Sequence, residues 1–298
     1  MGWKTVIIGC ESKVSVSLNR MKITIGNEYQ NIALCDIDTV IFSHAKTVIT
    51  IPLLTELVKN NIGVIICDQR NDPIGIFQPF NQHSLVFKQL SKQMNWKITR
   101  KKRLWKMIVE QKIQSEIEVL NMIDADKEVL KKLTEYRSSV YTDDQTNREA
   151  SAARLYFNTL FGSEFNRNNE DEVNYALNYG YKIIASYISK CIAARGMLTQ
   201  LGIHHIGESN PFNLTYDFIE PFRAIIDIWV YENVQDVFDV SLRRDIVDVL
   251  NYKVKVDQKW IRLCDGIEDV IDSYIAFLDE RSTTILSVDL SQGMREAE

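Results

Sequence analysis

Hydrophobic and polar positions alternate along the first part of the chain. Strict alternation covers residues 14–18 and 21–25, and turn residues such as Gly26-Asn27 punctuate it. Period-two patterns between turn residues are typical of half-buried antiparallel strands. The pattern therefore predicts about five strands in the first 43 residues, over residues 4–9, 14–18, 21–25, 31–35 and 37–42.

A helix and two further strands complete this strand-rich region. Pro52 fits the first turn of a helix that ends at the pair Asn60-Asn61. Residues 62–67 form a short apolar run that is typical of a buried strand, and residues 74–77 predict one last strand.

The period of the pattern then changes. From residue 83 apolar residues recur every three or four positions, which predicts helices up to about residue 280. Pro79 and Asn81 interrupt the pattern at residues 78–82, where we place a boundary. The sequence thus predicts an α+β fold, in which a small N-terminal antiparallel β domain (residues 1–80) precedes a larger all-α domain (residues 83–298).

Composition agrees with a folded protein of two domains. The chain has 298 residues, of which 45% are apolar and 10% aromatic, enough to form real cores. No stretch approaches the roughly 20 apolar residues that span a bilayer. The five cysteines form no C-x-x-C pair and are expected to be reduced core residues. We therefore expect a cytoplasmic protein with no membrane partner.

Charge is distributed unevenly and leaves room for a nucleic-acid partner. The net charge is −5, but residues 208–298 carry 19 acidic and 9 basic side chains, so residues 1–207 have an excess of five positive charges. Residues 97–113 hold seven basic side chains against Glu110 alone, with Trp105 among them. Such a helix can lie along phosphates, or it can be a solvated face above a buried stripe. Both interpretations stay open for the basic residues, whereas Trp105 is expected in the core.

One stretch, residues 198–223, concentrates candidate metal ligands. It contains His204, His205, Glu208, Asp217, Glu220 and Arg223, with Gly202, Gly207 and Pro211 breaking the chain between the histidines and the acids. Carboxylates suit Mg²⁺, and an added imidazole extends the preference to Mn²⁺. The spacing alone is more often that of a helix end with one capped and one exposed histidine.

Two upstream helices add polar candidates. Glu149 lies in the first turns of a helix that begins after Thr142, where it could simply complement the helix dipole. Asn174, Asn178 and Lys182 recur every four residues and share one helix face. Paired asparagines inside a helix indicate either a structural hydrogen-bond network or a network that orients neighbouring ligands.

Four blocks in a fixed order carry a family resemblance. They read Glu149-Ala-x-Ala-Ala-Arg154-x-Tyr156, Asn174-x-x-Leu177-Asn178-Tyr179-Gly180-Tyr181, Gly202-Ile-His-His205 and Asp217-Phe-Ile-Glu220-Pro-Phe-Arg223. Each block is weak singly, but the ordered set resembles the CRISPR spacer-acquisition integrase, the large subunit of the adaptation complex. The tight Gly-Ile-His-His loop is most similar to the version found in type II systems.

The resemblance implies a function and a site. It implies a metal-dependent DNA endonuclease and integrase that inserts prespacer DNA into a repeat array by attack of a 3′-hydroxyl. Glu149, His205 and Glu220 would be the catalytic metal ligands, holding Mg²⁺ or Mn²⁺. Asp217, Asn178 and Arg223 would be auxiliary, and Lys101, Lys102, Arg103, Lys106 and Arg154 are candidate DNA contacts. The partners would be double-stranded DNA, a second copy of the chain paired through its β domain, a small ferredoxin-like adaptation subunit and other CRISPR proteins.

Two other functions use the same residues. A structure-specific, metal-dependent nuclease of DNA repair would employ the same three ligands without joining DNA. A non-catalytic helical scaffold would bind DNA through its surface charges alone. No P-loop, dinucleotide-binding glycine motif or internal repeat is present in the sequence, which argues against a nucleotide-hydrolysing motor.

Overall fold

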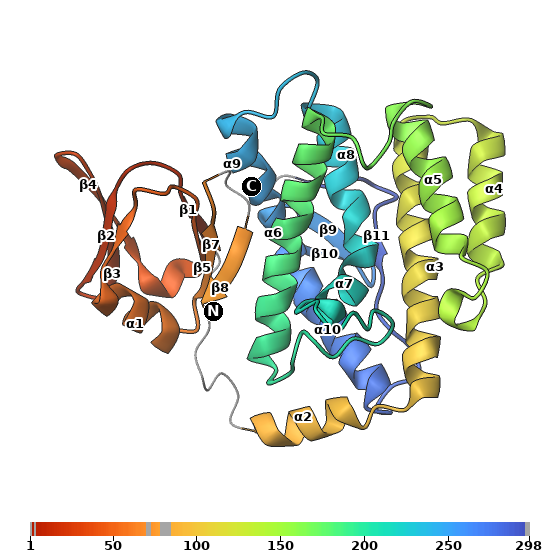
Figure 1. The fold of residues 1–298 in the computed structure, drawn as a ribbon, viewed down its shortest axis with the longest axis horizontal. Coiled ribbons are helices and arrows are strands. Elements are labelled where there is room, and N and C mark those ends of the chain that lie inside the picture. The colour runs from red at the N-terminus through yellow and green to blue at the C-terminus, as the bar shows by residue number, and fades with distance from the viewer. Residues whose placement is uncertain (1, 3, 70–72, 78–84, 296–298) are drawn as a thin grey trace. The chain divides into compact units, whose positions relative to one another are not determined.

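A computed structural model describes the chain apart from residues 1, 3, 70–72, 78–84 and 296–298 (Figure 1). The chain divides into two compact units, the first comprising residues 1–86 with residues 193–196 and the second comprising residues 87–192 with residues 197–298. The boundary predicted at residues 78–82 lies outside the described residues. Each unit is described by itself.

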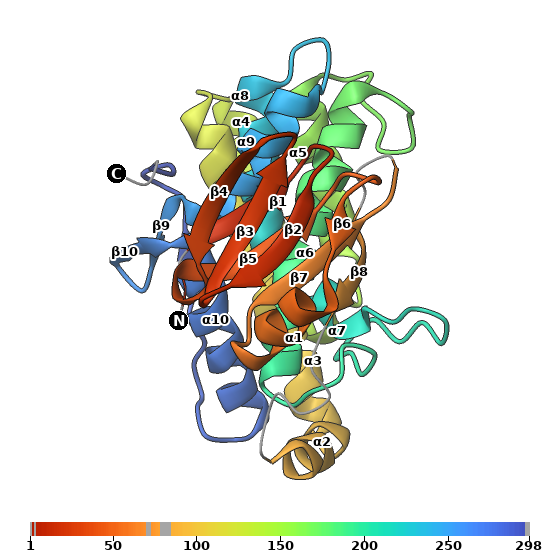
Figure 2. The ribbon, with the colours of Figure 1, turned by 90° about the vertical axis from the view of Figure 1, so that its left-hand side faces the viewer.

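In its described residues, the first unit contains two four-stranded sheets and one α-helix. Its elements are β1 (Lys4–Ile8), β2 (Lys13–Ser17), β3 (Arg20–Ile25), β4 (Glu28–Ala33), a 3-10 turn η1 (Leu34–Asp36), β5 (Ile37–Phe42), β6 (Val48–Ile49), α1 (Ile51–Lys59), β7 (Gly63–Cys67) and β8 (Pro73–Phe77). One sheet has the order β4-β3-β2-β6 and the other β1-β5-β7-β8; Figure 2 shows β2, β3 and β4 side by side. The helix after residue 50 and the predicted strands are therefore present, except that the strand predicted over residues 31–35 lies at Glu28–Ala33 and is followed by η1.

The strand directions correct one part of the prediction. The pairs β2–β3 and β3–β4 are antiparallel as expected, but β1 pairs with β5, and β5 with β7, in parallel. Helix α1 lies in the connection between β5 and β7, and such a crossover permits parallel pairing. Alternation reports that a strand is half-buried and says nothing of its partner's direction, so the pattern could not distinguish the two.

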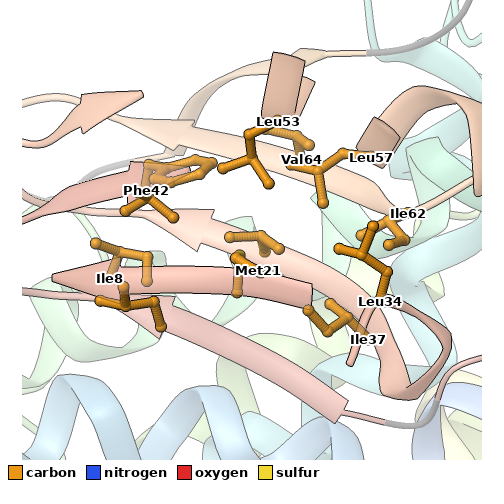
Figure 3. Packing of buried hydrophobic residues seen from close by; sticks show 12 residues of the cluster. Ile8, Met21, Leu34, Ile37, Phe42, Leu53, Leu57, Ile62 and Val64 are labelled. Atoms are coloured by element: carbon orange, nitrogen blue, oxygen red, sulfur yellow. The ribbon is translucent and has the colours of Figure 1, made fainter. Parts of the chain in front are cut away.

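The core of the first unit is aliphatic. Met21 from β3, Val64 from β7 and Leu53 from α1 are fully buried in one cluster, and Figure 3 shows their side chains gathered with those of neighbouring strands. The alternating residues of β2 and β3 thus supply one wall of this core. Burial of each such side chain contributes about 1.5 to 3 kcal/mol.

The second unit is mainly helical. Its helices are α2 (Val86–Met94), α3 (Ile98–Met122), α4 (Lys127–Ser138), α5 (Arg148–Phe161), α6 (Glu172–Ala194), α7 (Asn213–Ile219), α8 (Arg223–Asn233), α9 (Val240–Asp248) and α10 (Leu263–Leu278), with 3-10 turns η2 (Thr142–Asp144), η3 (Glu220–Phe222) and η4 (Val249–Asn251). Helix α3 contacts α4, α5, α8, α10 and η3, and Figure 1 shows α3, α4 and α5 packed side by side. The fold class, strands followed by a helical body, is confirmed.

The helical body also contains a small sheet, which corrects the all-α prediction. Strands β9 (Lys253–Val256) and β10 (Lys259–Arg262) form an antiparallel hairpin, and β11 (Val288–Asp289) pairs with β9. Asp257 and Gln258 at its tip have positive φ values of 48° and 65°, as a tight hairpin turn requires. In the described part of the chain no helix is long and apolar enough to cross a membrane.

Candidate active site

Two of the predicted ligands meet at a lysine. Lys112, from the middle of α3, places its Nζ 2.6 Å from Oε1 of Glu149 on α5 and 2.5 Å from Oε2 of Glu220 on η3. The lysine side chain is only 12% exposed. Two carboxylates that are 71 residues apart in the sequence therefore converge on one positive charge.

The position of Glu149 is fixed by a carboxylate cap. Asp144 accepts hydrogen bonds from the backbone N–H of Arg148, at 2.9 Å, and of Glu149, at 3.0 Å. Such a cap satisfies donors that the first turn of a helix leaves free. Asp144 thus caps the helix, whereas the side chain of Asn147 makes no capping hydrogen bond.

Glu220 is buried between two cations. Its Oε1 accepts a hydrogen bond from Arg223 Nε at 2.9 Å, and its side chain is 4% exposed. Burial alone would raise the pKa of the Glu220 carboxyl, but the charges of Arg223 and Lys112 lower it to about 2. Oε2 lies 2.5 Å from Lys112 Nζ, so each oxygen of the carboxylate faces a cation.

His205 is held by Asp217. The Nδ1 atom of the histidine ring lies 2.7 Å from Asp217 Oδ1, and the backbone N–H of His205 donates to the same oxygen at 3.0 Å. This hydrogen bond raises the pKa of His205, against the opposite effect of burial, and the charges of Glu220 and Glu149 add to the increase. Because Nδ1 is engaged, Nε2 is the ring nitrogen left for a ligand or a reacting oxygen.

Asp217 organises the whole histidine loop. It is fully buried on α7, and its Oδ2 accepts the backbone N–H of Ile203 at 2.6 Å and of His204 at 3.2 Å. Gly202 allows the loop to fold this closely, because a Cβ at that position would lie 2.2 Å from His205 O and 2.8 Å from Asp217 Oδ2. Asp217 is therefore a positioning residue for His205.

His204 faces a second acidic residue. Its ring stacks on the buried Trp105 ring, with centroids 4.1 Å apart and an interplanar angle of 4°. Its Nδ1 lies 3.3 Å from Asp143 Oδ1, and Asp143 is also paired with Lys102 Nζ at 2.9 Å. Trp105 meets the His205 ring edge-on at 5.6 Å as well, so this core tryptophan supports both histidines.

The predicted asparagine network binds an arginine. Arg167 donates to Asn174 Oδ1, and it donates to Asn178 Oδ1 at 2.7 Å. Asn174 is buried, whereas Asn178 is exposed. The network therefore orients the Arg167 segment, and no hydrogen bond from the two asparagines to Glu149 or His205 is seen in the described residues.

Arg223 extends the site into a buried polar cluster. Its guanidinium lies 4.7 Å from the centre of the Tyr181 ring, and Tyr181 and Tyr156 both donate to the buried Asp227. Burial raises the pKa of Asp227 to about 6, although the hydrogen bonds from the two tyrosines act in the opposite direction. Arg223 thus joins Glu220 to this cluster.

The basic residues of α3 contact acidic neighbours. Lys102 pairs with Asp143, and Lys106 Nζ lies 3.6 Å from Glu110 Oε1, one turn further along the helix. Lys101 is half-buried. Exposed pairs of this kind are weak and can exchange for phosphate, so the assignment of these lysines to DNA stays a prediction.

The two candidate arginines lie in different surroundings. Arg103 is exposed, and its guanidinium lies 5.9 Å from the centre of the Phe277 ring. Arg154 is exposed on α5 and lines a pocket of about 520 Å³ together with Arg167 and Phe157. The lining also includes Glu164, and Arg167 already donates to Asn174 and Asn178, so a DNA contact by Arg154 stays a prediction.

The donor types fit a divalent cation, and the geometry fits in part. Glu149 and Glu220 already share one positive charge, and Glu220 Oε2 is a buried oxygen without a hydrogen-bond partner. Carboxylate oxygens with one imidazole suit Mg²⁺ or Mn²⁺. Over the described ranges, however, no group of three or more His, Cys, Asp or Glu side chains is close enough to hold a metal ion. The three-ligand site stays a prediction.

Sequence reasoning missed the lysine at the centre of the site. Lys112 stood among seven basic residues that were interpreted together as a DNA-binding or solvated face. Its spacing held a signal, because it lies seven positions after the core residue Trp105 and four after the buried Ile108, on the inward face of the helix. A lysine at such a position needs an acidic partner.

Comparison with solved structures defines the class of the fold. A casposase bound to integration product is similar with a TM-score of 0.77 and 20% identity, over 99% of this chain and 95% of that one. A Cas6-RT-Cas1–Cas2 complex is similar with a TM-score of 0.69 and 16% identity, over 93% of this chain and 35% of that one. The fold is therefore of the Cas1-like class.

Sequence comparison then identifies the family. The family described as CRISPR associated protein Cas1 matches residues 5–236. The CRISPR-associated endonuclease Cas1 of Neisseria meningitidis serogroup C (strain 8013) is 32% identical over 293 residues, which are 97% of this chain and 96% of the relative. The chain belongs to the Cas1 family, and the resemblance found in its four sequence blocks is confirmed.

Proposed function

We propose that this chain is a metal-dependent DNA integrase and endonuclease of CRISPR adaptation. The observation that carries the proposal is the convergence of Glu149 and Glu220 on a single cationic point, beside a histidine loop, in a chain of the Cas1 family. Paired carboxylates can hold a metal ion that assists phosphoryl transfer.

The three predicted ligands would hold Mg²⁺ or Mn²⁺. Glu149 and Glu220 supply carboxylate oxygens, and His205 supplies Nε2 because Nδ1 is bound to Asp217. When bound, the cation neutralises charge that develops on the scissile phosphate. A hydrogen bond to Asp217 orients the ring of His205. Asp144 caps the helical turn that carries Glu149. Arg223 donates a hydrogen bond to Glu220 and holds its carboxylate in place.

The reaction exchanges one phosphodiester for another. The 3′-hydroxyl of the prespacer attacks a phosphate in the repeat strand, a new P–O bond forms, and the bond to the 3′ oxygen of the repeat breaks. The attacking hydroxyl loses a proton and the departing oxygen gains one. In place of ligating the cation, His205 could supply that proton, since the hydrogen bond to Asp217 raises the pKa of its ring.

The partners follow from the same proposal. Double-stranded DNA would contact Arg154 and the basic residues Lys101, Lys102, Arg103 and Lys106. A structural relative is a complex that contains both Cas1 and Cas2, which supports a small Cas2-like partner subunit for this chain. A homodimer formed through the strand-rich unit remains part of the proposal.

A strand-transfer assay tests the function. Purified chain, its small partner subunit, a prespacer with free 3′ ends and a repeat-containing plasmid are mixed with Mn²⁺. We expect joined products from the wild type, and at least a hundredfold loss in each of Glu149→Gln, His205→Ala and Glu220→Gln, as expected for removal of a metal ligand. Full activity in all three variants would refute the site.

A nuclease without joining activity is the second candidate. The Neisseria relative is named an endonuclease, which supports cleavage as an activity in its own right. The same assay separates the two, because cleaved but never joined products would indicate a structure-specific nuclease. DNA binding with neither product would indicate a non-catalytic scaffold.

A further inference from the structure

The proposed function leaves Lys112 unexplained. Its ammonium group occupies the point at which Glu149 Oε1 and Glu220 Oε2 converge, at 2.6 and 2.5 Å. The second oxygen of Glu220 is bound to Arg223. A divalent cation that uses both carboxylates would therefore compete with the lysine for Glu220 Oε2.

A cation and the ammonium group cannot share these oxygens at close range. Like charges a few ångströms apart repel strongly where water is scarce, and the Glu220 side chain is only 4% exposed. The ammonium group is held at this point by close contacts with two carboxylates. Binding of the cation thus requires the ammonium group to move.

A second acceptor for the ammonium group lies one helical turn away. Glu116 is four residues after Lys112 on α3, a spacing at which side chains on a helix meet. Glu116 is 3% exposed, and within the described part of the chain its Oε2 has no hydrogen-bond partner. A buried carboxylate oxygen without a partner is costly, and an incoming ammonium group would satisfy it.

We propose that Lys112 competes with the divalent cation for Glu149 and Glu220. Without the cation its ammonium group holds the two carboxylates together, and it turns to Glu116 when the cation binds. The inference rests on the proposed metal site and deepens it. Lys112 then lowers the affinity of the site for a divalent cation, and Glu116 limits that effect by accepting the displaced ammonium group. The flexible four-carbon stem of lysine permits the movement.

Mn²⁺ binding to the purified chain tests the proposal without measuring activity. Isothermal titration calorimetry at pH 8 is performed on the wild type, Lys112→Met, Glu116→Gln and the double variant. We expect Lys112→Met to bind Mn²⁺ roughly tenfold more tightly, because one ion-pair rearrangement is removed from binding. We expect Glu116→Gln to bind severalfold more weakly, and to have no effect in the Lys112→Met background.

Two control variants isolate the position of the charge. Lys131→Met removes a lysine from an exposed position on α4 and should leave Mn²⁺ affinity unchanged. Lys112→Arg keeps the positive charge and should not bind Mn²⁺ more tightly. If it did gain affinity, loss of the positive charge would not explain the gain in Lys112→Met. The near-isosteric Glu116→Gln provides an independent test if Lys112→Met does not fold.

The outcomes separate the inference from the function. Equal or weaker Mn²⁺ binding by Lys112→Met, or unchanged binding by Glu116→Gln, would overturn the role of Lys112 while leaving the metal site intact. If neither the wild type nor any variant bound Mn²⁺, the proposed metal site itself would be refuted, and the competitor role with it.

Discussion

Substitution of Asp217 by asparagine should disorganise the histidine loop. The buried carboxylate accepts from the N–H of Ile203 and His204 on one oxygen, and from the N–H and Nδ1 of His205 on the other. An asparagine side chain has one oxygen and one amino group. If its amino group faces Ile203 and His204, both backbone donors lose their acceptor. If it faces His205, the backbone N–H of His205 loses its acceptor, and the ring must change its tautomer to accept at Nδ1.

The cost follows from the number of hydrogen bonds lost. A hydrogen bond to a charged group contributes about 1.5 to 3 kcal/mol, so two of them amount to about 3 to 6 kcal/mol. In a domain of this size that loss lowers the melting temperature by on the order of 10 °C. Thermal unfolding followed by circular dichroism measures it. The exposed Asp245→Asn on α9 is the control and should melt as the wild type does.

A second measurement isolates the effect on His205. Its hydrogen bond to Asp217 raises the pKa of the ring, so Asp217→Asn should lower that pKa. A pH titration of the imidazole resonances by NMR determines it. If Asp217→Asn has the same melting temperature as Asp245→Asn and leaves the pKa of His205 unchanged, Asp217 does not position this loop.

Three further variants or treatments test other parts of the site. Burial raises the pKa of Glu116 from 4.5 to about 8, so the unfolded chain loses this proton at lower pH than the folded chain does. The free energy of unfolding of the wild type should therefore fall between these pH values by up to a few kcal/mol. Urea unfolding at several pH values should show a smaller fall for Glu116→Gln, and equal falls in the two proteins would contradict this. Asp144→Ala removes the cap of α5 and should cost about 1 kcal/mol in the same unfolding assay, with a reduced strand-transfer rate; an unchanged rate would show that the cap does not position Glu149. Chelation by EDTA should abolish joining and Mn²⁺ should restore it, whereas joining in EDTA would exclude a metal-dependent reaction.

Much of the fold could be predicted from the pattern of apolar residues. Their alternation predicted the strands β2 and β3, and their recurrence every three or four residues predicted the helical region that contains α3 and α6. The parallel pairing of β5 with β7 could not be predicted, because apolar residues alternate in the same way in parallel and antiparallel half-buried strands. The hairpin of β9 and β10 was missed although Lys253-Val-Lys-Val256 alternates, since its strands are short and lie among helices.

The site was predicted less completely than the fold. The residue types around His205 and Glu220 indicated a cation site, and the family resemblance added Glu149. The partners that hold them come from other elements: Lys112 belongs to a basic run on α3, and Asp144 to a turn before α5. Local sequence patterns do not report which distant side chains meet in a buried site, because tertiary packing decides this.

The location of a bound cation tests the central claim most directly. Crystals of the chain grown with Mn²⁺ and measured at the manganese absorption edge would show the ion as an anomalous difference peak. We predict one peak within coordination distance of Glu149, Glu220 and His205 Nε2, with the Lys112 ammonium group turned away from both carboxylates. A peak that lies elsewhere, or a lysine that still bridges the two glutamates at saturating Mn²⁺, would contradict the account.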